Sequence, residues 1–127
     1  MRPVIPQVSD SELTLMKIVW DSGGTALYAH IMERLAQTGC AWQKNTVITL
    51  LSRLVDKGLL TTNKLGRRNQ YTAAVSQGEY QTAQARTLLD KLYQGDAKGL
   101  VATLIQGELL SPADYEELKR YWEGEGR

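Results

Sequence analysis

The side chains best suited to contact a partner lie on one predicted helix, within the stretch WQKNTVITLLSRLVDKGLL at residues 42–60. At 100° per residue, its apolar side chains share one face: Val47, Leu50, Leu51 and Leu54. The opposite face carries short polar side chains: Asn45, Thr49, Ser52 and Asp56. Thr46 and Arg53 flank this polar face on one side, and Ile48 lies at its other edge. Short hydroxyl and amide groups let a helix approach a surface closely, whereas a solvated face more often carries long Glu and Lys side chains. The pattern therefore favours a docking face.

Residues for catalysis or metal binding are scarce in this sequence. Cys40 is the single cysteine and His30 the single histidine, which excludes an intrachain disulfide and a cysteine-rich metal cluster. The sequence has no glycine-rich phosphate loop and no His-Glu metal motif. We therefore expect no enzyme activity, no metal site and no cofactor. Cys40 is expected to be a passive residue near a helix end, with an intermolecular or redox thiol as the alternative.

Charge is distributed unevenly along the chain. The net charge is +1, but residues 1–75 hold nine Lys/Arg and five Asp/Glu, net +4, and residues 76–127 hold six and nine, net −3. Between residues 34 and 78, one acid, Asp56, accompanies a set of basic residues: Arg34, Lys44, Arg53, Lys57, Lys64, Arg67 and Arg68. This pattern predicts that the first half binds an anion such as nucleic acid. An uneven but merely solvated surface is the alternative.

Three predicted helices position the docking face. The first begins at Ser9, with Glu12 at the capping-box position. The second is expected to begin near Thr25. The third is the amphipathic segment within residues 42–57, and Gly58 ends it.

A predicted β-hairpin follows the third helix. Residues 59–64 and 69–75 are the expected strands, with the turn at Leu65-Gly66-Arg67-Arg68. Mostly α structure with a small β-hairpin in this order is the winged helix-turn-helix arrangement. In that arrangement the third helix enters the DNA major groove and the hairpin, or wing, lies along the DNA backbone. Winged helices also bind proteins, so a protein-interaction module is the rival hypothesis.

The second half of the chain is predicted to be helical and too small for a core of its own. Sharing apolar surface between two copies would solve this burial problem. We therefore expect a winged-helix DNA-binding domain at residues 1–75 and a helical dimerisation lobe at residues 76–127. The expected dimer interface consists of apolar residues on these helices: Leu88, Leu92, Leu100, Leu104, Leu118 and Trp122. The alternative is that the helices fold back on the winged domain of the same chain.

The sequence predicts a cytoplasmic protein without membrane insertion. No run of about 18 apolar residues is present. The N-terminal stretch MRPVIPQVSDSE lacks the apolar centre of a signal peptide and soon becomes acidic.

Three stretches carry a family resemblance: VSDSELTLMKIVW, TVITLLSRLVDKGLL and RRNQYTA. In this order they resemble the BlaI/MecI-type penicillinase and methicillin-resistance repressors, over residues 8–122. The resemblance implies a bacterial, homodimeric transcriptional repressor of the β-lactam-resistance type that binds a palindromic double-stranded DNA operator. The DNA contacts implied at matching positions are Thr46, Thr49 and Arg53, with Lys44 and Asn45 at the helix start and Arg67 and Arg68 at the wing.

Physical chemistry assigns different roles to these DNA contacts. Thr46 and Thr49 suit contacts to bases or to a phosphate. A threonine methyl can contact the methyl group of a thymine, and the hydroxyl can donate a hydrogen bond to a phosphate. Arg53, further along the helix, is better placed for a phosphate. Lys44, Arg67 and Arg68 are expected to add affinity without sequence information. Those contacts would belong to the same DNA-binding face.

The sequence also departs from its relatives. Ile48 occupies a position that is often basic in the family, where it would either contact thymine or simply pack. The tail YWEGEGR lacks the Cys-x-Cys-x4-Cys-x-Cys motif of the related copper repressors, so metal sensing by that route is not expected. The β-lactam-responsive relatives are cleaved at an Asn-Phe bond, and a membrane-bound sensor peptidase triggers this cleavage indirectly. The matching bond here is Thr103–Leu104, and its cleavage is a hypothesis.

Overall fold

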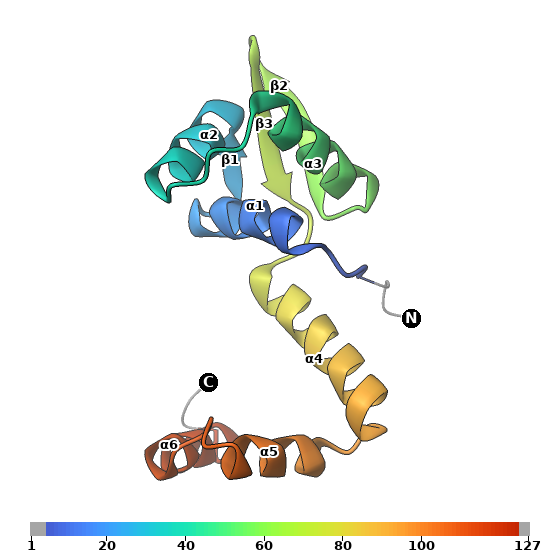
Figure 1. Cartoon of the computed structure of the whole chain (residues 1–127), viewed down its shortest axis with the longest axis vertical. Coiled ribbons are helices and arrows are strands. Elements are labelled where there is room, and N and C mark those ends of the chain that lie inside the picture. Colours follow the sequence, from blue (N-terminus) through green and yellow to red (C-terminus); the bar gives the residue numbers. More distant parts are fainter. Residues whose placement is uncertain (1–4, 125–127) are drawn as a thin grey trace. The chain divides into compact units, whose positions relative to one another are not determined.

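The computed structural model describes residues 5–124. They form two compact units, of which the first ends at Gln84 and the second begins at Ala85. Among the described residues, the first unit contains three helices, three strands and the start of a fourth helix, and the second unit is helical (Figure 1). The outermost residues of both predicted domains, 1–4 and 125–127, lie outside the described residues.

The first unit has the predicted winged helix-turn-helix fold. Its elements follow one another as α1 (Asp10–Asp21), β1 (Thr25–Leu27), α2 (Tyr28–Gln37), α3 (Lys44–Asp56), β2 (Leu60–Leu65) and β3 (Arg68–Ala73). The strands form an antiparallel sheet in the order β1-β3-β2. The predicted fold class, mostly α with a small β-hairpin in a winged helix-turn-helix domain, is confirmed.

A single apolar core holds α1, α2 and α3 against the sheet. Its most deeply buried side chains come from every one of these helices and from the segment entering β2: Leu15, Met16, Val19, Ile31, Leu35, Val47, Leu51, Leu54, Leu59 and Leu60. Their spacing of three and four residues on the helices is the reason these segments fold as amphipathic helices.

The start of the second helix was predicted wrongly. Thr25 does not cap a helix but begins β1, in which Thr25 pairs with Thr72 and Leu27 with Gln70. α2 begins at Tyr28, and no side chain caps it. The predicted two-stranded hairpin is therefore part of a three-stranded sheet. A three-residue strand is too short to show alternation, and threonine is common both in strands and before helices.

The first turn of α4 (Gln77–Tyr93) packs on the winged unit. Ser76 and Glu79 form a capping box, since the Ser76 N–H donates to Glu79 Oε1 at 2.8 Å and the Glu79 N–H to Ser76 Oγ at 3.0 Å. Tyr80 is buried, its ring centroid lies 5.8 Å from that of Trp20, and its hydroxyl accepts from the Val8 N–H at 3.2 Å. These contacts tie the start of α4 to α1.

The second unit contains the rest of α4, then α5 (Ala97–Gln106) and α6 (Pro112–Trp122). Ser111 caps α6 and Asp114 completes a capping box, with Pro112 in the first turn. None of the described residues of α5 and α6 is buried. No helix in the described part of the chain is long and apolar enough to cross a membrane.

A buried carboxylate joins the start of α1 to the end of α3. The side chain of Glu12 is only 3% exposed, and its Oε1 accepts from the Ser9 N–H at 2.8 Å and from Lys57 Nζ at 2.8 Å. Burial raises the pKa of Glu12, but the hydrogen bonds from Lys57 and Ser9 outweigh this effect, so that the pKa is lowered from its ordinary value. The contact therefore stabilises the fold in the ionised form of Glu12.

Replacing Glu12 by glutamine should lower the free energy of unfolding at pH 7 by about 1–3 kcal/mol. This is below the usual cost of breaking a buried ion pair, because the Lys57 side chain is 34% exposed. Since the native pKa of Glu12 is lowered, the wild-type advantage is fully present above pH 4.5, the ordinary pKa. It should disappear as the pH falls through the native value. Urea unfolding at fixed protein concentration, from pH 7 down to pH 3, measures both effects.

Glu116→Gln is the matched control. Glu116 meets Lys119 at 3.5 Å on the surface, and both side chains are largely exposed. Its replacement should therefore change the free energy of unfolding by no more than about 0.5 kcal/mol. Equal stability of wild type and Glu12→Gln at pH 7, or a difference that does not vary with pH, would contradict the role assigned to the buried pair.

Candidate nucleic-acid interface

α3 is held by one face and leaves the other free. Val47, Leu50, Leu51 and Leu54 are buried in the core. The outward residues are all exposed, as the sequence predicted for a docking face: Lys44, Asn45, Thr46, Ile48, Thr49, Ser52 and Arg53. The core thus fixes the direction in which these seven side chains leave the helix.

Thr49 and Asn45 are linked along the outward face. The Thr49 hydroxyl donates to the Asn45 carbonyl oxygen at 2.9 Å, which commits its single proton to the helix. The Thr49 oxygen then remains available as an acceptor, and its methyl group as an apolar contact. This geometry favours the methyl over hydrogen-bond donation as the means by which Thr49 would contact a base.

The beginning of α3 suits an anion. The helix starts at Lys44, no side chain caps it, and its first turn holds no acidic residue. The partial positive charge of the helix N-terminus is therefore reinforced by the Lys44 ammonium. A phosphate beside this turn would meet both.

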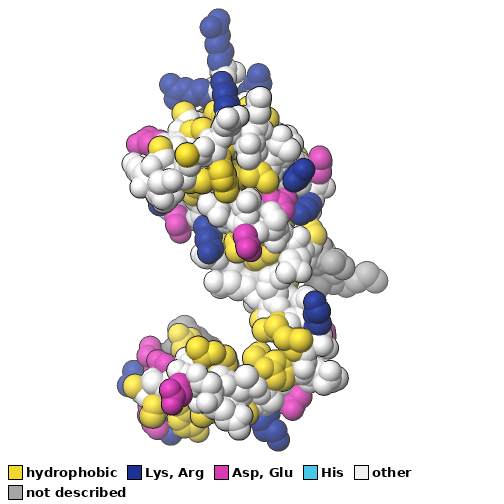
Figure 2. Space-filling model, in the orientation of Figure 1, with side chains coloured by type: hydrophobic (Ala, Val, Ile, Leu, Met, Phe, Trp, Pro, Cys, Tyr) yellow, Lys and Arg dark blue, Asp and Glu magenta, His cyan; other side chains and the backbone are white. Residues whose placement is uncertain are grey.

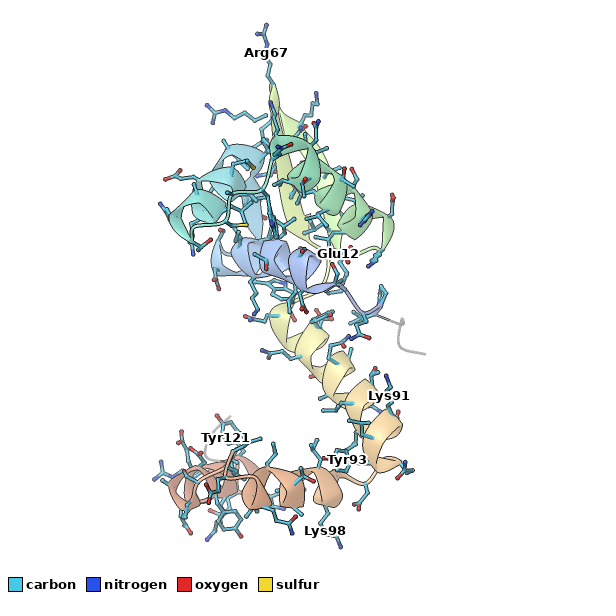
Figure 3. The ribbon with its side chains drawn as sticks, in the orientation of Figure 1. Glu12, Arg67, Lys91, Tyr93, Lys98 and Tyr121 are labelled. Atoms are coloured by element: carbon cyan, nitrogen blue, oxygen red, sulfur yellow. The ribbon has the colours of Figure 1, made fainter. Side chains whose placement is uncertain are left out.

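The wing ends in a tight, basic turn. β2 and β3 pair as far as Leu65 and Arg68, so the turn consists of Gly66 and Arg67 alone and is shorter than the predicted four residues. Gly66 has φ 65°, a left-handed conformation that favours glycine. Arg67 projects from the tip of the hairpin (Figure 3). Lys64 and Arg68 are exposed beside it, and Lys and Arg side chains gather at this end of the unit (Figure 2).

Lys57 belongs to the predicted basic stretch, but its ammonium is paired with a carboxylate of the same unit. It lies 2.8 Å from the Glu12 carboxylate, so it is a stabilising residue of the fold. The sequence did not reveal this pair, because its members are separated by 45 residues. The sequence indicated for Glu12 only a role in the capping box at the start of the first helix. The charge that remains for an external anion therefore lies on α3, on the wing and at Arg34 of α2.

In the second unit, the predicted interface residues are distributed as follows. Leu88, Leu92, Leu118 and Trp122 are exposed, Trp122 to 92%. Leu100 and Leu104 are half-buried. Further apolar residues, outside the predicted interface list, are also exposed: Val101, Ile105, Leu109, Tyr115 and Tyr121. Apolar side chains form patches on the surface of this unit, among polar and charged ones (Figure 2).

The bond between Thr103 and Leu104 lies within α5. Thr103 is exposed, and its hydroxyl donates to the Gly99 carbonyl oxygen at 3.1 Å. No described residue of α5 is buried, so little packing within the unit opposes local opening of this helix.

Metal-binding geometry is absent from the described residues, which contain no group of three or more His, Cys, Asp or Glu side chains able to hold an ion. Cys40 is half-buried and has a free thiol. It lies before α3 and contributes to the packing around the core.

Comparison with known proteins identifies the family. Residues 8–124 match the family described as "Penicillinase repressor". The chain is 31% identical to the penicillinase repressor of Bacillus licheniformis over 114 residues, 90% of this chain and 88% of that protein. It is 28% identical to the methicillin resistance regulatory protein MecI of Staphylococcus aureus strain N315, over 89% of this chain and 90% of that protein.

A solved structure of a relative covers the winged unit. It is the solution structure of the monomeric form of B. licheniformis BlaI in complex with the blaP half-operator. The identity is 36% and the TM-score 0.51, over 60% of this chain and 90% of that one. One family matches nearly the whole chain, and the relatives share its sequence and its fold. The chain is therefore a member of the penicillinase repressor family, whose members are transcriptional repressors and not enzymes.

Proposed function

We propose that this protein is a transcriptional repressor that binds a palindromic DNA operator as a homodimer and thereby blocks RNA polymerase. The observation that carries the proposal is the exposed polar face of α3 beside a basic wing tip. A relative with the same winged fold has been solved in complex with a half-operator. Such a repressor would act in the bacterial cytoplasm.

On DNA, α3 would enter the major groove and the wing would follow the backbone. Asn45, Thr46 and Thr49 face outward from the helix and would contact base edges or nearby phosphates. Lys44 and Arg53, at the start and in the last turn of the helix, would neutralise phosphates. Arg67 and Arg68 would do the same from the wing.

A second copy would supply the core that the helical unit lacks. Leu118 and Trp122 lie four residues apart on α6, and both are exposed. Tyr115 extends the same face. Covering these side chains would remove apolar surface from water, at about 25 cal/mol per Å². We therefore assign residues 1–75 to DNA binding and residues 76–127 to dimerisation.

Dimerisation would govern release from DNA. One winged domain makes too few contacts to hold an operator alone, so two half-sites about 10 bp apart, or a multiple of this, would be occupied together. Cleavage of the Thr103–Leu104 bond, prompted indirectly by a membrane-bound sensor peptidase, would remove α6 from the lobe. The exposure of α5 supports this route. Recovery of only intact protein from cells in which a β-lactam induces the target genes would oppose it.

Two substitutions should separate affinity from specificity. Arg67→Ala should weaken binding to operator and scrambled duplex alike and reduce the salt slope by about 2, because the dimer loses one phosphate contact in each protomer. Thr49→Ala should reduce operator preference by about 1–3 kcal/mol, whereas Thr49→Val, which keeps the methyl, should retain much of it. Fluorescence anisotropy measures affinity and salt slope on two duplexes, one from upstream of the protein's own gene and one scrambled. Each duplex is titrated across a salt series.

Lys98→Ala is the control for charge. Lys98 is exposed on α5 in the second unit (Figure 3), so its removal should leave affinity and salt slope unchanged. Absence of duplex binding at low salt by the wild-type protein would oppose DNA binding altogether. A loss of operator preference in Arg67→Ala equal to that in Thr49→Ala would oppose the division of roles.

A charge on the apolar face of α6 should break the dimer. Leu118→Asp should shift the protein to monomer in sedimentation at micromolar concentration and should abolish tight binding to the palindrome, leaving weak half-site binding. Ala113→Asp adds the same charge on the opposite face of α6, near the helix start where an acid is favourable. It should remain dimeric. A dimeric Leu118→Asp protein, or a monomeric wild type, would contradict the assigned interface.

A further inference from the structure

Ile48 is an apolar side chain on the otherwise polar outer face of α3. It is 41% exposed, whereas Val47, Leu50, Leu51 and Leu54 are buried and Val55 packs against the core. Ile48 does not belong to the core or to the residues packed against it. Its exposure is therefore not explained by a role in stabilising the winged unit.

The position of Ile48 places it among polar groups suited to DNA. Lys44 lies four residues before it and Ser52 four residues after it, so all three share one stripe of the helix. Asn45 and Thr49 border the stripe on the side of the polar face. The Thr49 hydroxyl donates into the helix, which leaves a threonine methyl as a second apolar group beside Ile48. The two form a small apolar surface framed by polar and basic side chains.

The major groove offers one apolar group to such a surface. Among the four bases, only thymine carries a methyl group there, at C5. The β-branched side chain of Ile48 has few accessible rotamers, so little entropy is lost when it is held against that methyl. A basic side chain at this position would instead bind a phosphate or donate hydrogen bonds to a guanine, and an amide side chain would pair with an adenine.

We infer that Ile48 is a specificity-determining residue that recognises the 5-methyl group of one thymine in each half-operator. The inference rests on the proposed DNA-binding function and names a feature of the sequence to which the protein binds. Thr49 would border the same methyl, and Lys44 would hold a neighbouring phosphate. A cytosine at that position would present a C5 hydrogen in place of the methyl group, so the Ile48 side chain would lose this apolar contact.

Deoxyuridine provides a direct test, because it differs from thymidine only by the missing methyl group. The full chain is first used to select tight-binding duplexes from a random-sequence pool. Each thymine of the selected half-site is then replaced by deoxyuridine, in both half-sites at once. For the wild type, one position should weaken binding about fourfold per half-site, or about tenfold or more for the dimer, as expected for one methyl withdrawn from an apolar contact.

The matched variants assign that effect to a side chain. Ile48→Ala should bind the thymine and deoxyuridine duplexes with nearly equal affinity at this position, whereas Ile48→Val should retain most of the difference. Because Ile48 is exposed, these variants should unfold at the wild-type urea concentration. Ile48→Lys should add about 2 to the salt slope of the dimer, one for each protomer, and should lose sensitivity to the methyl group.

The outcomes separate this inference from the function on which it rests. Selection of a duplex family, with a deoxyuridine effect that disappears only in Ile48→Ala and Ile48→Lys, would support the inference. Selection of duplexes that lack a thymine in the half-site, or a deoxyuridine effect that is unchanged in Ile48→Ala, would overturn the inference and leave the repressor function intact. Failure to select any duplex would overturn both.

Discussion

The two-faced packing of α3 is the constraint on which the rest of the structure depends. Val47, Leu51 and Leu54 complete the core of the winged unit, and this burial sets the rotation of the helix about its axis. Because the period of the helix is 3.6 residues, the outward direction of Asn45 and Thr49 follows from the same packing. A side chain that disturbed the buried face would therefore also move the docking face, even though it touched no DNA.

Much of the winged unit could be predicted from the sequence because its signals are local. The capping box of Ser9 and Glu12 and the alternation of buried and outward residues on α3 lie within a few residues of each other. β1 was missed because its pairing with Thr72 joins segments 47 residues apart. The contact between Lys57 and Glu12 is equally remote in sequence. The charge pattern therefore assigns Lys57 to the anion-binding surface, whereas in the fold its ammonium pairs with a carboxylate.

The candidate site was predictable to a different degree. The exposure of Thr46, Thr49 and Arg53 follows from helical periodicity and was correctly anticipated. Two features follow only from the folded structure. One is the hydrogen bond that the Thr49 hydroxyl donates to the Asn45 carbonyl. The other is the exposure of Ile48, whose place at the edge of the polar face is compatible in sequence with packing or with contact. Side-chain rotamers and partial burial depend on neighbours that periodicity alone does not supply. In the second unit, the structure adds the exposed side chain of Leu109, which the predicted interface does not include.

The arrangement of charges divides affinity from specificity. Lys57 is withdrawn by Glu12, so the exposed basic residues of the proposed interface are five per protomer: Lys44, Arg53, Lys64, Arg67 and Arg68. If all of them neutralised phosphates in a dimer, the slope of log K against log salt would reach about −9, which is an upper bound. The central outward positions of α3, from Asn45 to Thr49, carry no charge. Contacts made there would add little salt dependence, so discrimination between DNA sequences would persist at salt concentrations that weaken binding as a whole.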